Sequence, residues 1–226
     1  MLEKKIPLRY IPVDISTKAL NLLTDSMERS FNNLQVYQKN GDYFEMLDDL
    51  RQTYPQPKVI LFLGSNLGNL GYEEGIHFLS RLAEAMYAHD KLLIGLDLKK
   101  DPGIIRKAYD DPHGYTRAFN LNLLDRFNRE LQTDFRTDRF DHVPVYDPQT
   151  GAAKSYLISR VNQTVFFPSL EKNLDLPRWE TIFTEISQKY DLQMIQEMAK
   201  KSGFQIIDHF FDSREYFVNS IWSKQA

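Results

Sequence analysis

The spacing of apolar residues along this chain alternates between patterns typical of strands and patterns typical of helices. The clearest apolar run spans residues 59–63. That run (Val-Ile-Leu-Phe-Leu) ends in the small, polar turn of residues 64–69, after which apolar residues recur at helical spacing. An unbroken run of this length is typical of a strand buried on both faces, as in a parallel α/β sheet. Ligands of such sheets bind beyond the carboxyl ends of the strands, so the turn is where we expect a ligand. A strand-to-helix turn that merely requires glycine is the alternative.

The same alternation extends on both sides of this run. Short strand patterns occupy residues 8–14, 34–37 and 92–98, and the second of them leads into a predicted turn over residues 40–44. Helical spacing occupies residues 17–31, with Ser16 as a plausible N-cap, and residues 73–89. Strands that alternate with helices predict a doubly wound, mostly parallel α/β sheet.

The pattern changes after residue 101. Residues 102–138 are expected to be helical, and residues 140–167 to form strands broken by a hairpin turn at residues 147–151. A helix closed by Gly203 and an antiparallel pair (204–211 and 216–222) end the chain. We therefore divide the chain into a partial sheet domain (1–103), an inserted region (104–190) and a final helix and strand pair (191–226).

Composition narrows the functional class. The 226 residues carry a net charge of −3, which gives no electrostatic reason to expect nucleic acid or an anionic membrane as a partner. The chain has no cysteine, so disulfides, thiolate metal sites and a thiol nucleophile are excluded, and its five histidines show no metal-binding spacing. We assign no metal. Without an apolar span or a secretory signal, a cytoplasmic protein is expected.

Acidic residues at the ends of two predicted strands suggest a ligand class. Asp14 ends the first strand, where a carboxylate can accept hydrogen bonds from a ribose diol. Asp42 and Tyr43 follow the second strand, where a carboxylate can accept from an amino group and an aromatic ring can stack on a base. Each alone is more simply a cap or turn residue, but together they favour a ligand that contains a nucleoside.

The ordered set of motifs resembles the histidine-specific methyltransferases that depend on S-adenosylmethionine and make hercynine in ergothioneine biosynthesis. The resemblance covers nearly the whole chain. Its motifs are YIPVDIS (10–16), GDYF (41–44), LFLGSNLGN (61–69), GLDLKKD (95–101), AYDD (108–111), AFNLN (118–122), NREL (128–131), TEISQKY (184–190) and the closing segment 217–222. It implies a Rossmann-like class I methyltransferase sheet with an inserted α+β region that recognises the substrate.

The resemblance also implies roles for single residues. Asp14, Ser16, Asp42, Tyr43 and Gly64 match positions that bind S-adenosylmethionine, Asp14 at the ribose and Asp42 with Tyr43 at the adenine. The positions that match the amino-acid site are Gly64, Asn69, Tyr109, Glu185 and Ser187.

Within that site the resemblance places Asn69 and Tyr109 at the main-chain polar groups of the substrate, where they are the catalytic candidates. Glu185 and Ser187 match the two side chains that read the imidazole ring. Residues two apart on an extended segment share one face, so this pair can address both ring nitrogens. A solvated strand face is the alternative for the two residues.

The implied reaction moves a methyl group from the sulfonium to the α-amino nitrogen of L-histidine. Family members carry a first strand and a glycine-rich loop ahead of the segment that matches residues 10–16, and only nine residues precede Tyr10 here. We therefore expect a sheet without its first strand and with unpaired edges, which a homodimer could complete. The alternatives are a non-catalytic binding or assembly relative, and an N-methyltransferase for another amine.

Overall fold

The computed structural model describes residues 8–31 and 34–225. The helices are α1 (Thr17–Ser30), α2 (Tyr43–Thr53), α3 (Tyr72–Ala85), α4 (Pro102–Tyr109), α5 (Tyr115–Leu131) and α6 (Leu192–Lys201). The strands are β1 (Arg9–Tyr10), β2 (Val13–Asp14), β3 (Gln35–Val36), β4 (Lys39–Asn40), β5 (Val59–Phe62), β6 (Lys91–Asp97), β7 (Phe140–Asp147), β8 (Ala152–Ser159), β9 (Gln163–Phe167), β10 (Lys172–Leu176), β11 (Thr181–Gln188), β12 (Phe204–Phe211) and β13 (Phe217–Lys224).

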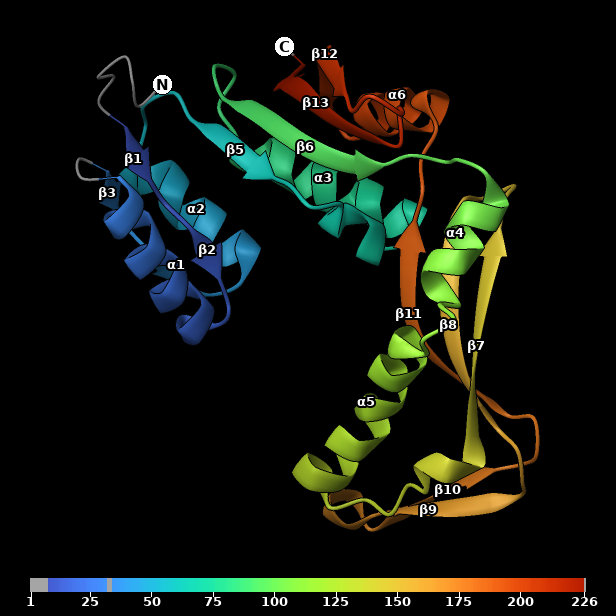
Figure 1. Ribbon diagram of the computed structural model, residues 1–226. Coiled ribbons are helices and arrows are strands. Elements are labelled where there is room, and N and C mark those ends of the chain that lie inside the picture. The colour runs from blue at the N-terminus through green and yellow to red at the C-terminus, as the bar shows by residue number, and fades with distance from the viewer. Residues whose placement is uncertain (1–7, 32–33, 226) are drawn as a thin grey trace.

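A four-stranded sheet with the order β12-β13-β6-β5 forms the centre of the molecule (Figure 1). β5 and β6 are parallel, as the apolar run predicts, whereas β13 is antiparallel to both β6 and β12. The predicted antiparallel pair at the end of the chain is confirmed, and it extends the main sheet beside β6, with β13 inside the sheet and β12 at its edge.

One face of this sheet packs against α3 and α6. The buried core combines Leu92 and Ile94 of β6 with Trp222 of β13, Leu79 of α3 and Ile195 of α6, and all five side chains are fully buried. Burial of a large apolar side chain contributes about 1.5–3 kcal/mol, so this layer is the main source of stability for the sheet.

The prediction that residues 59–63 are buried on both faces is wrong for the described part of the chain. β5 is an edge strand, and only Ile60 and Phe62 pack against the α3 layer. Val59 and Leu61 point to the other face and are 56% and 52% exposed. The prediction fails because an unbroken apolar run indicates what a strand is suited to contact, not which elements lie beside it.

The first described strands pair with each other and not with β5. β1 pairs in parallel with β3, and β2 with β4, as two short steps of one kinked ribbon that α1 accompanies (Figure 1). Among the described residues, the edge of β5 that faces away from β6 has no partner strand. This arrangement agrees with the expected unpaired edges.

Two helix boundaries differ from the predictions for identifiable reasons. α2 begins at Tyr43, within the predicted turn, because the Asp42 side chain accepts a hydrogen bond from the Phe44 amide and caps the helix. α3 ends at Ala85 instead of continuing to residue 89, because Asp90 holds the Tyr87 amide in a turn. His89, the last residue of the predicted helix, lies in that turn.

The region between β6 and α6 forms a second lobe. β11-β8-β7 make an antiparallel sheet, β9 and β10 form a separate hairpin, and α4 and α5 replace the single helical stretch expected over 102–138 (Figure 1). The lobe has a small core of its own, which includes Leu124 of α5, Phe140 of β7 and Leu157 of β8. The three-part division of the chain stays a prediction.

Asp90 gives a test of what holds the start of β5 beside the start of β6. Its buried carboxylate accepts from the amides of Lys58 and Tyr87, at 2.9 Å each, and pairs with the Lys58 ammonium at 3.3 Å. Asp90→Ala leaves these donors without their acceptor, so we expect a loss of about 2–4 kcal/mol in the free energy of unfolding. Urea denaturation measures it. Asp138→Ala removes an exposed carboxylate and should change stability by less than about 0.5 kcal/mol; equal losses in the two variants would contradict the role given to Asp90.

Candidate active site

Two of the predicted nucleoside-binding acids lie at the ends of neighbouring parallel strands. β2 and β4 pair Asp14 with Asn40, and the Asn40 amide group donates to the carbonyl oxygens of Asp14 and Ile15 at 3.1 and 3.0 Å. Asp42 follows two residues after Asn40, so the carboxylates of Asp14 and Asp42 belong to adjacent strand ends.

Both acids also accept hydrogen bonds from nearby backbone amides, and Asp42 caps α2. Asp14 accepts from the Ser16 amide at 2.7 Å, and the Ser16 hydroxyl accepts from the Ala19 amide at 3.2 Å to begin α1. Asp42 accepts from the Phe44 amide at 2.9 Å. In each carboxylate this bond uses one oxygen. The bond therefore fixes the side chain and leaves the second oxygen available to a ligand.

Tyr43 connects these strand ends to β5. Its ring contacts Phe62 and Phe78 edge-on, with centroids 6.1 and 6.3 Å apart, and it remains 42% exposed. Gly64 follows β5 and adopts a φ of +75°, a left-handed conformation that favours glycine. An aromatic ring and an exposed backbone turn therefore lie at the carboxyl end of β5.

The turn after Gly64 is built against the end of β11. The short 3₁₀ turn η2 (Asn66–Asn69) buries Gly68, where a Cβ atom would lie 2.9 Å from the Gln188 carbonyl oxygen. Asn69, the next residue, is exposed. The structure thus brings the turn that carries Asn69 beside the strand that carries Ser187, although 118 residues separate them in sequence.

Glu185 and Ser187 both lie on β11, as the extended-segment interpretation requires. They pair opposite Ser155 and Ala153 of β8, beyond a bulge that falls between Phe183 and Glu185. The Ser155 hydroxyl donates to the Glu185 carboxylate at 3.2 Å and contacts the His142 ring at 3.1 Å. Burial lowers the pKa of His142, and the nearby Glu185 charge opposes the shift only in part.

Lys189 connects two of the predicted substrate residues, Tyr109 and Ser187. Its ammonium donates to the Tyr109 hydroxyl at 2.7 Å and to the Ser187 hydroxyl at 2.7 Å, and pairs with the Asp97 carboxylate at 2.9 Å. The side chain is 4% exposed. Burial alone would lower the pKa of Lys189, but its bonds to Tyr109 and Asp97 outweigh burial and raise it. The lysine is therefore charged at neutral pH.

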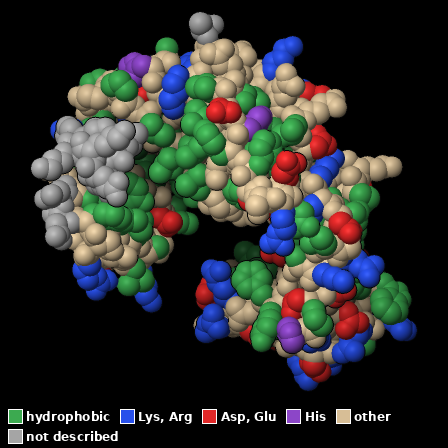
Figure 2. All heavy atoms as spheres, turned by 45° about the horizontal axis from the view of Figure 1, so that its top comes forward, with side chains coloured by type: hydrophobic (Ala, Val, Ile, Leu, Met, Phe, Trp, Pro, Cys, Tyr) green, Lys and Arg blue, Asp and Glu red, His purple; other side chains and the backbone are tan. Residues whose placement is uncertain are grey.

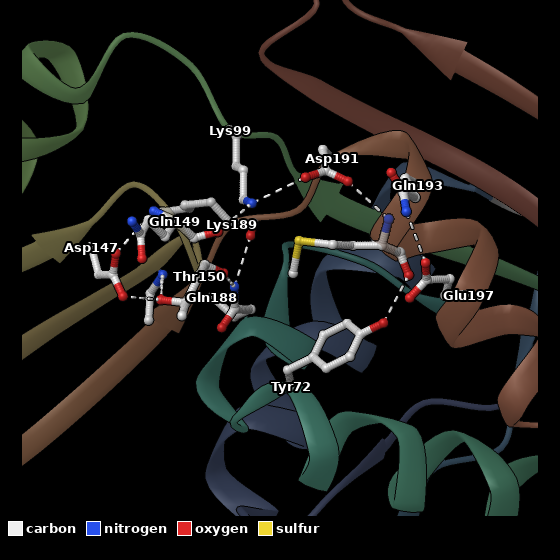
Figure 3. Close-up of polar contacts among 12 residues, drawn as sticks. Tyr72, Lys99, Asp147, Gln149, Thr150, Gln188, Lys189, Asp191, Gln193 and Glu197 are labelled. Carbon is white, nitrogen blue, oxygen red and sulfur yellow. Dashed lines mark hydrogen bonds and ion pairs between the residues drawn. The ribbon is translucent and has the colours of Figure 1, made fainter.

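A second set of contacts fixes the backbone around Lys189. Gln188 donates to the Thr150 carbonyl oxygen in the β7–β8 turn, and Lys99 donates to the Gln149 carbonyl oxygen and to Asp191 at 3.0 Å each (Figure 3). The Lys189 amide donates to the Gly151 carbonyl oxygen at 2.8 Å. The hairpin turn predicted at 147–151 thus accepts hydrogen bonds from the chain where it leaves β11 and returns to the main sheet.

The structure brings the predicted residues together as two groups. Asp14, Ser16, Asp42 and Tyr43 form one group at the β2 and β4 ends, and Tyr109 and Ser187, both bonded to Lys189, form the other, with Glu185 on the same strand as Ser187. Gly68 of the turn approaches the end of β11, and Phe62, which ends β5 just before the turn, contacts Tyr43. Figure 2 shows the surface hollowed between the second lobe and the rest of the molecule. A separate depression of about 320 Å³ lies at β9 and β10, and no predicted site residue lines it.

Sequence reasoning missed Lys189, Asp97 and Ser155. A signal for the lysine was present, because residues 185, 187 and 189 continue one strand alternation. The described residues contain no group of three or more metal-ligating side chains, and none of their helices is long and apolar enough to cross a membrane.

Gly68 offers a test of the contact between the two halves of the site. Gly68→Ala places a methyl group against the Gln188 backbone, which cannot rotate away, so we expect a loss of about 1–3 kcal/mol in unfolding free energy. The control is Gly75→Ala inside α3, where the nearest atom would be 3.6 Å from the new Cβ and helix propensity favours alanine. Thermal unfolding of both variants measures the difference. No destabilisation by Gly68→Ala would contradict the close approach.

Comparison with known proteins identifies the family. The family described as "Histidine-specific methyltransferase, SAM-dependent" matches residues 1–224. The chain is 31% identical to a histidine N-alpha-methyltransferase of Mycobacterium tuberculosis, over 96% of this chain and 67% of that protein. It is 33% identical to the protein of that name from Mycolicibacterium smegmatis, over 85% and 60%.

Two further likenesses are more distant. Ergothioneine biosynthesis protein 1 of Schizosaccharomyces pombe is 26% identical over 80% of this chain and 23% of its own length. A solved S-adenosylmethionine-dependent methyltransferase of Clostridium acetobutylicum aligns over 97% of this chain and 76% of its own, with a TM-score of 0.49 and 10% identity. The chain thus spans between about a quarter and two thirds of the length of these curated relatives. With the family match over residues 1–224 and the α/β fold predicted for it, this chain belongs to the S-adenosylmethionine-dependent histidine-specific methyltransferases.

Proposed function

We propose that this chain carries the substrate-reading part of an enzyme that transfers methyl groups from S-adenosylmethionine to the α-amino nitrogen of L-histidine, giving hercynine. The observation that carries the proposal is the arrangement of Glu185 and Ser187 on one strand face, tied through Lys189 to Tyr109. Family membership and the names of the two mycobacterial relatives support the substrate.

The chemistry of Glu185 and Ser187 suits a neutral imidazole. A carboxylate accepts a hydrogen bond from the ring N–H, while a hydroxyl can donate to the other ring nitrogen, which carries a lone pair. The Ser155 hydroxyl engages one oxygen of Glu185 and holds the carboxylate in place. A phenyl or indole ring would leave at least one of these two groups unpaired, which gives the site a basis for selecting histidine.

Tyr109 and Asn69 are proposed to hold the amino and carboxylate groups of the substrate. Tyr109 ends α4, with its hydroxyl on the same ammonium as Ser187, and Asn69 lies on the turn that packs against the end of β11. Main-chain and ring contacts of the amino acid would therefore be made by neighbouring elements of one rigid junction. Such fixed geometry is what brings an amine into line with a methyl donor.

The residues at the β2 and β4 ends fit the nucleoside half of S-adenosylmethionine. Asp14 and Asp42 each have a carboxylate oxygen to offer, and the half-exposed Tyr43 ring lies between these ends and β5. When bound, S-adenosylmethionine supplies the electrophilic methyl group. The chain's part is to hold the amine, after it has lost its proton to solvent, with its lone pair toward that carbon.

Calorimetric titration tests the proposal. We expect the chain to bind S-adenosylhomocysteine, and L-histidine to bind the resulting complex. Glu185→Ala removes the acceptor for the ring N–H and should weaken histidine binding about 10- to 100-fold, while S-adenosylhomocysteine binding stays unchanged. The matched control is Glu180→Ala, which removes an exposed carboxylate just before β11.

Two results would contradict the proposal. If the unchanged, folded chain binds neither compound, it is not sufficient for this function. If it binds histidine and Glu185→Ala binds equally well, the imidazole site is not on this face of β11, and a different amine becomes the substrate to test.

A further inference from the structure

The strongest feature outside the predicted residues is the buried ammonium of Lys189. A lysine that is 4% exposed is uncommon, because desolvation of the charge is costly unless partners replace the lost water. Here three oxygen atoms replace it, from Asp97, Tyr109 and Ser187. An ammonium has three N–H donors and no acceptor, so these three contacts use its full capacity.

This geometry has a consequence for the two hydroxyl groups. Each accepts a hydrogen bond from Lys189, and an ammonium cannot accept one in return. The hydroxyl hydrogens of Tyr109 and Ser187 therefore point away from the ammonium, so each group keeps its O–H to donate to another partner. A hydroxyl without such a neighbour can turn to donate or accept and so selects less strongly.

Asp97 explains why the ammonium stays in place. It ends β6, and its amide donates to the Ser65 hydroxyl in the turn after β5 at 3.1 Å. Its carboxylate pairs with Lys100 as well as Lys189. The Tyr190 amide also donates to the Asp97 carbonyl oxygen at 3.0 Å, so the backbone that carries Lys189 is bonded to the residue that pairs with its side chain.

We propose that Lys189 is a positioning residue that sets the hydrogen-bond polarity of the amino-acid site. By donating to Ser187 it commits that hydroxyl to donate to a ring nitrogen, so that Glu185 as acceptor and Ser187 as donor together select a neutral imidazole. By donating to Tyr109 it commits the phenol to donate to an acceptor of the amino acid. The inference rests on the proposed function and deepens it, since it identifies which residue fixes the selectivity.

The test compares two amino acids of similar shape, L-histidine and L-3-(2-thienyl)alanine, whose ring offers neither nitrogen. Affinities of both are measured by calorimetry in the presence of S-adenosylhomocysteine. Lys189→Met should weaken histidine binding about tenfold more than thienylalanine binding, because only histidine uses the directed Ser187 hydroxyl. Any loss through Tyr109 affects both compounds equally and cancels from the ratio.

Two further variants separate positioning from support of the fold. Lys189→Arg keeps a charge for Asp97, but a planar guanidinium cannot place three donors around one nitrogen, so the histidine preference should fall here too. In a protein that already carries Ser187→Ala, the added substitution Lys189→Met should change the ratio of histidine affinity to thienylalanine affinity little further. Lys172→Met, at an exposed lysine of β10, is the control that should leave the ratio unchanged.

The outcomes distinguish this inference from the proposed function. If the unchanged chain does not bind histidine, the proposed function fails and the inference fails with it. If the unchanged chain binds histidine and folded Lys189→Met or Lys189→Arg weakens both amino acids equally, or neither, only the inference is overturned. Circular dichroism of each variant establishes that it is folded, and either lysine variant is sufficient to decide.

Discussion

The return of the chain from the second lobe to the main sheet depends on one junction. There the end of β11 runs beside the end of β6, with a parallel bridge between Leu98 and Tyr190 and the Lys189–Asp97 ion pair alongside. The two strands meet although residues 98–180 of the chain lie between them. If this junction were flexible, the distance between the side chains of the second lobe and the main sheet would vary. The buried charge pair and the backbone bonds remove that freedom.

A buried ion pair is a costly way to make such a junction. Apolar residues of similar volume often stabilise a protein more, because charges lose their hydration on burial. The pair in this chain does something that an apolar contact cannot, since it also orients two hydroxyl groups. Its presence is therefore better explained by the direction it gives to neighbouring donors than by the free energy of folding.

Much of the fold could be predicted from the sequence where the signal is local. The hairpin at 147–151 and the final antiparallel pair follow from turn chemistry and apolar spacing, and the structure confirms both. The position of β5 at an edge could not be predicted, because it depends on which elements lie beside the strand. Likewise, one strand alternation placed Glu185 and Ser187 on a common face, whereas the meeting of Lys189 with Tyr109, 80 positions apart, depends on the path of the chain between them.

The order of strands in the main sheet also bears on how the chain folds as it is made. β13, residues 217–224, lies between β6 and β12, so one of the two inner positions of that sheet belongs to the strand that is synthesised after the other three. Val218 and Trp222 of this strand are fully buried against residues made more than 100 positions earlier. The apolar layer of α3 and β6 therefore stays incomplete until β13 has been synthesised. Such delayed, long-range pairing slows folding and lengthens the time in which chaperones can bind the nascent chain.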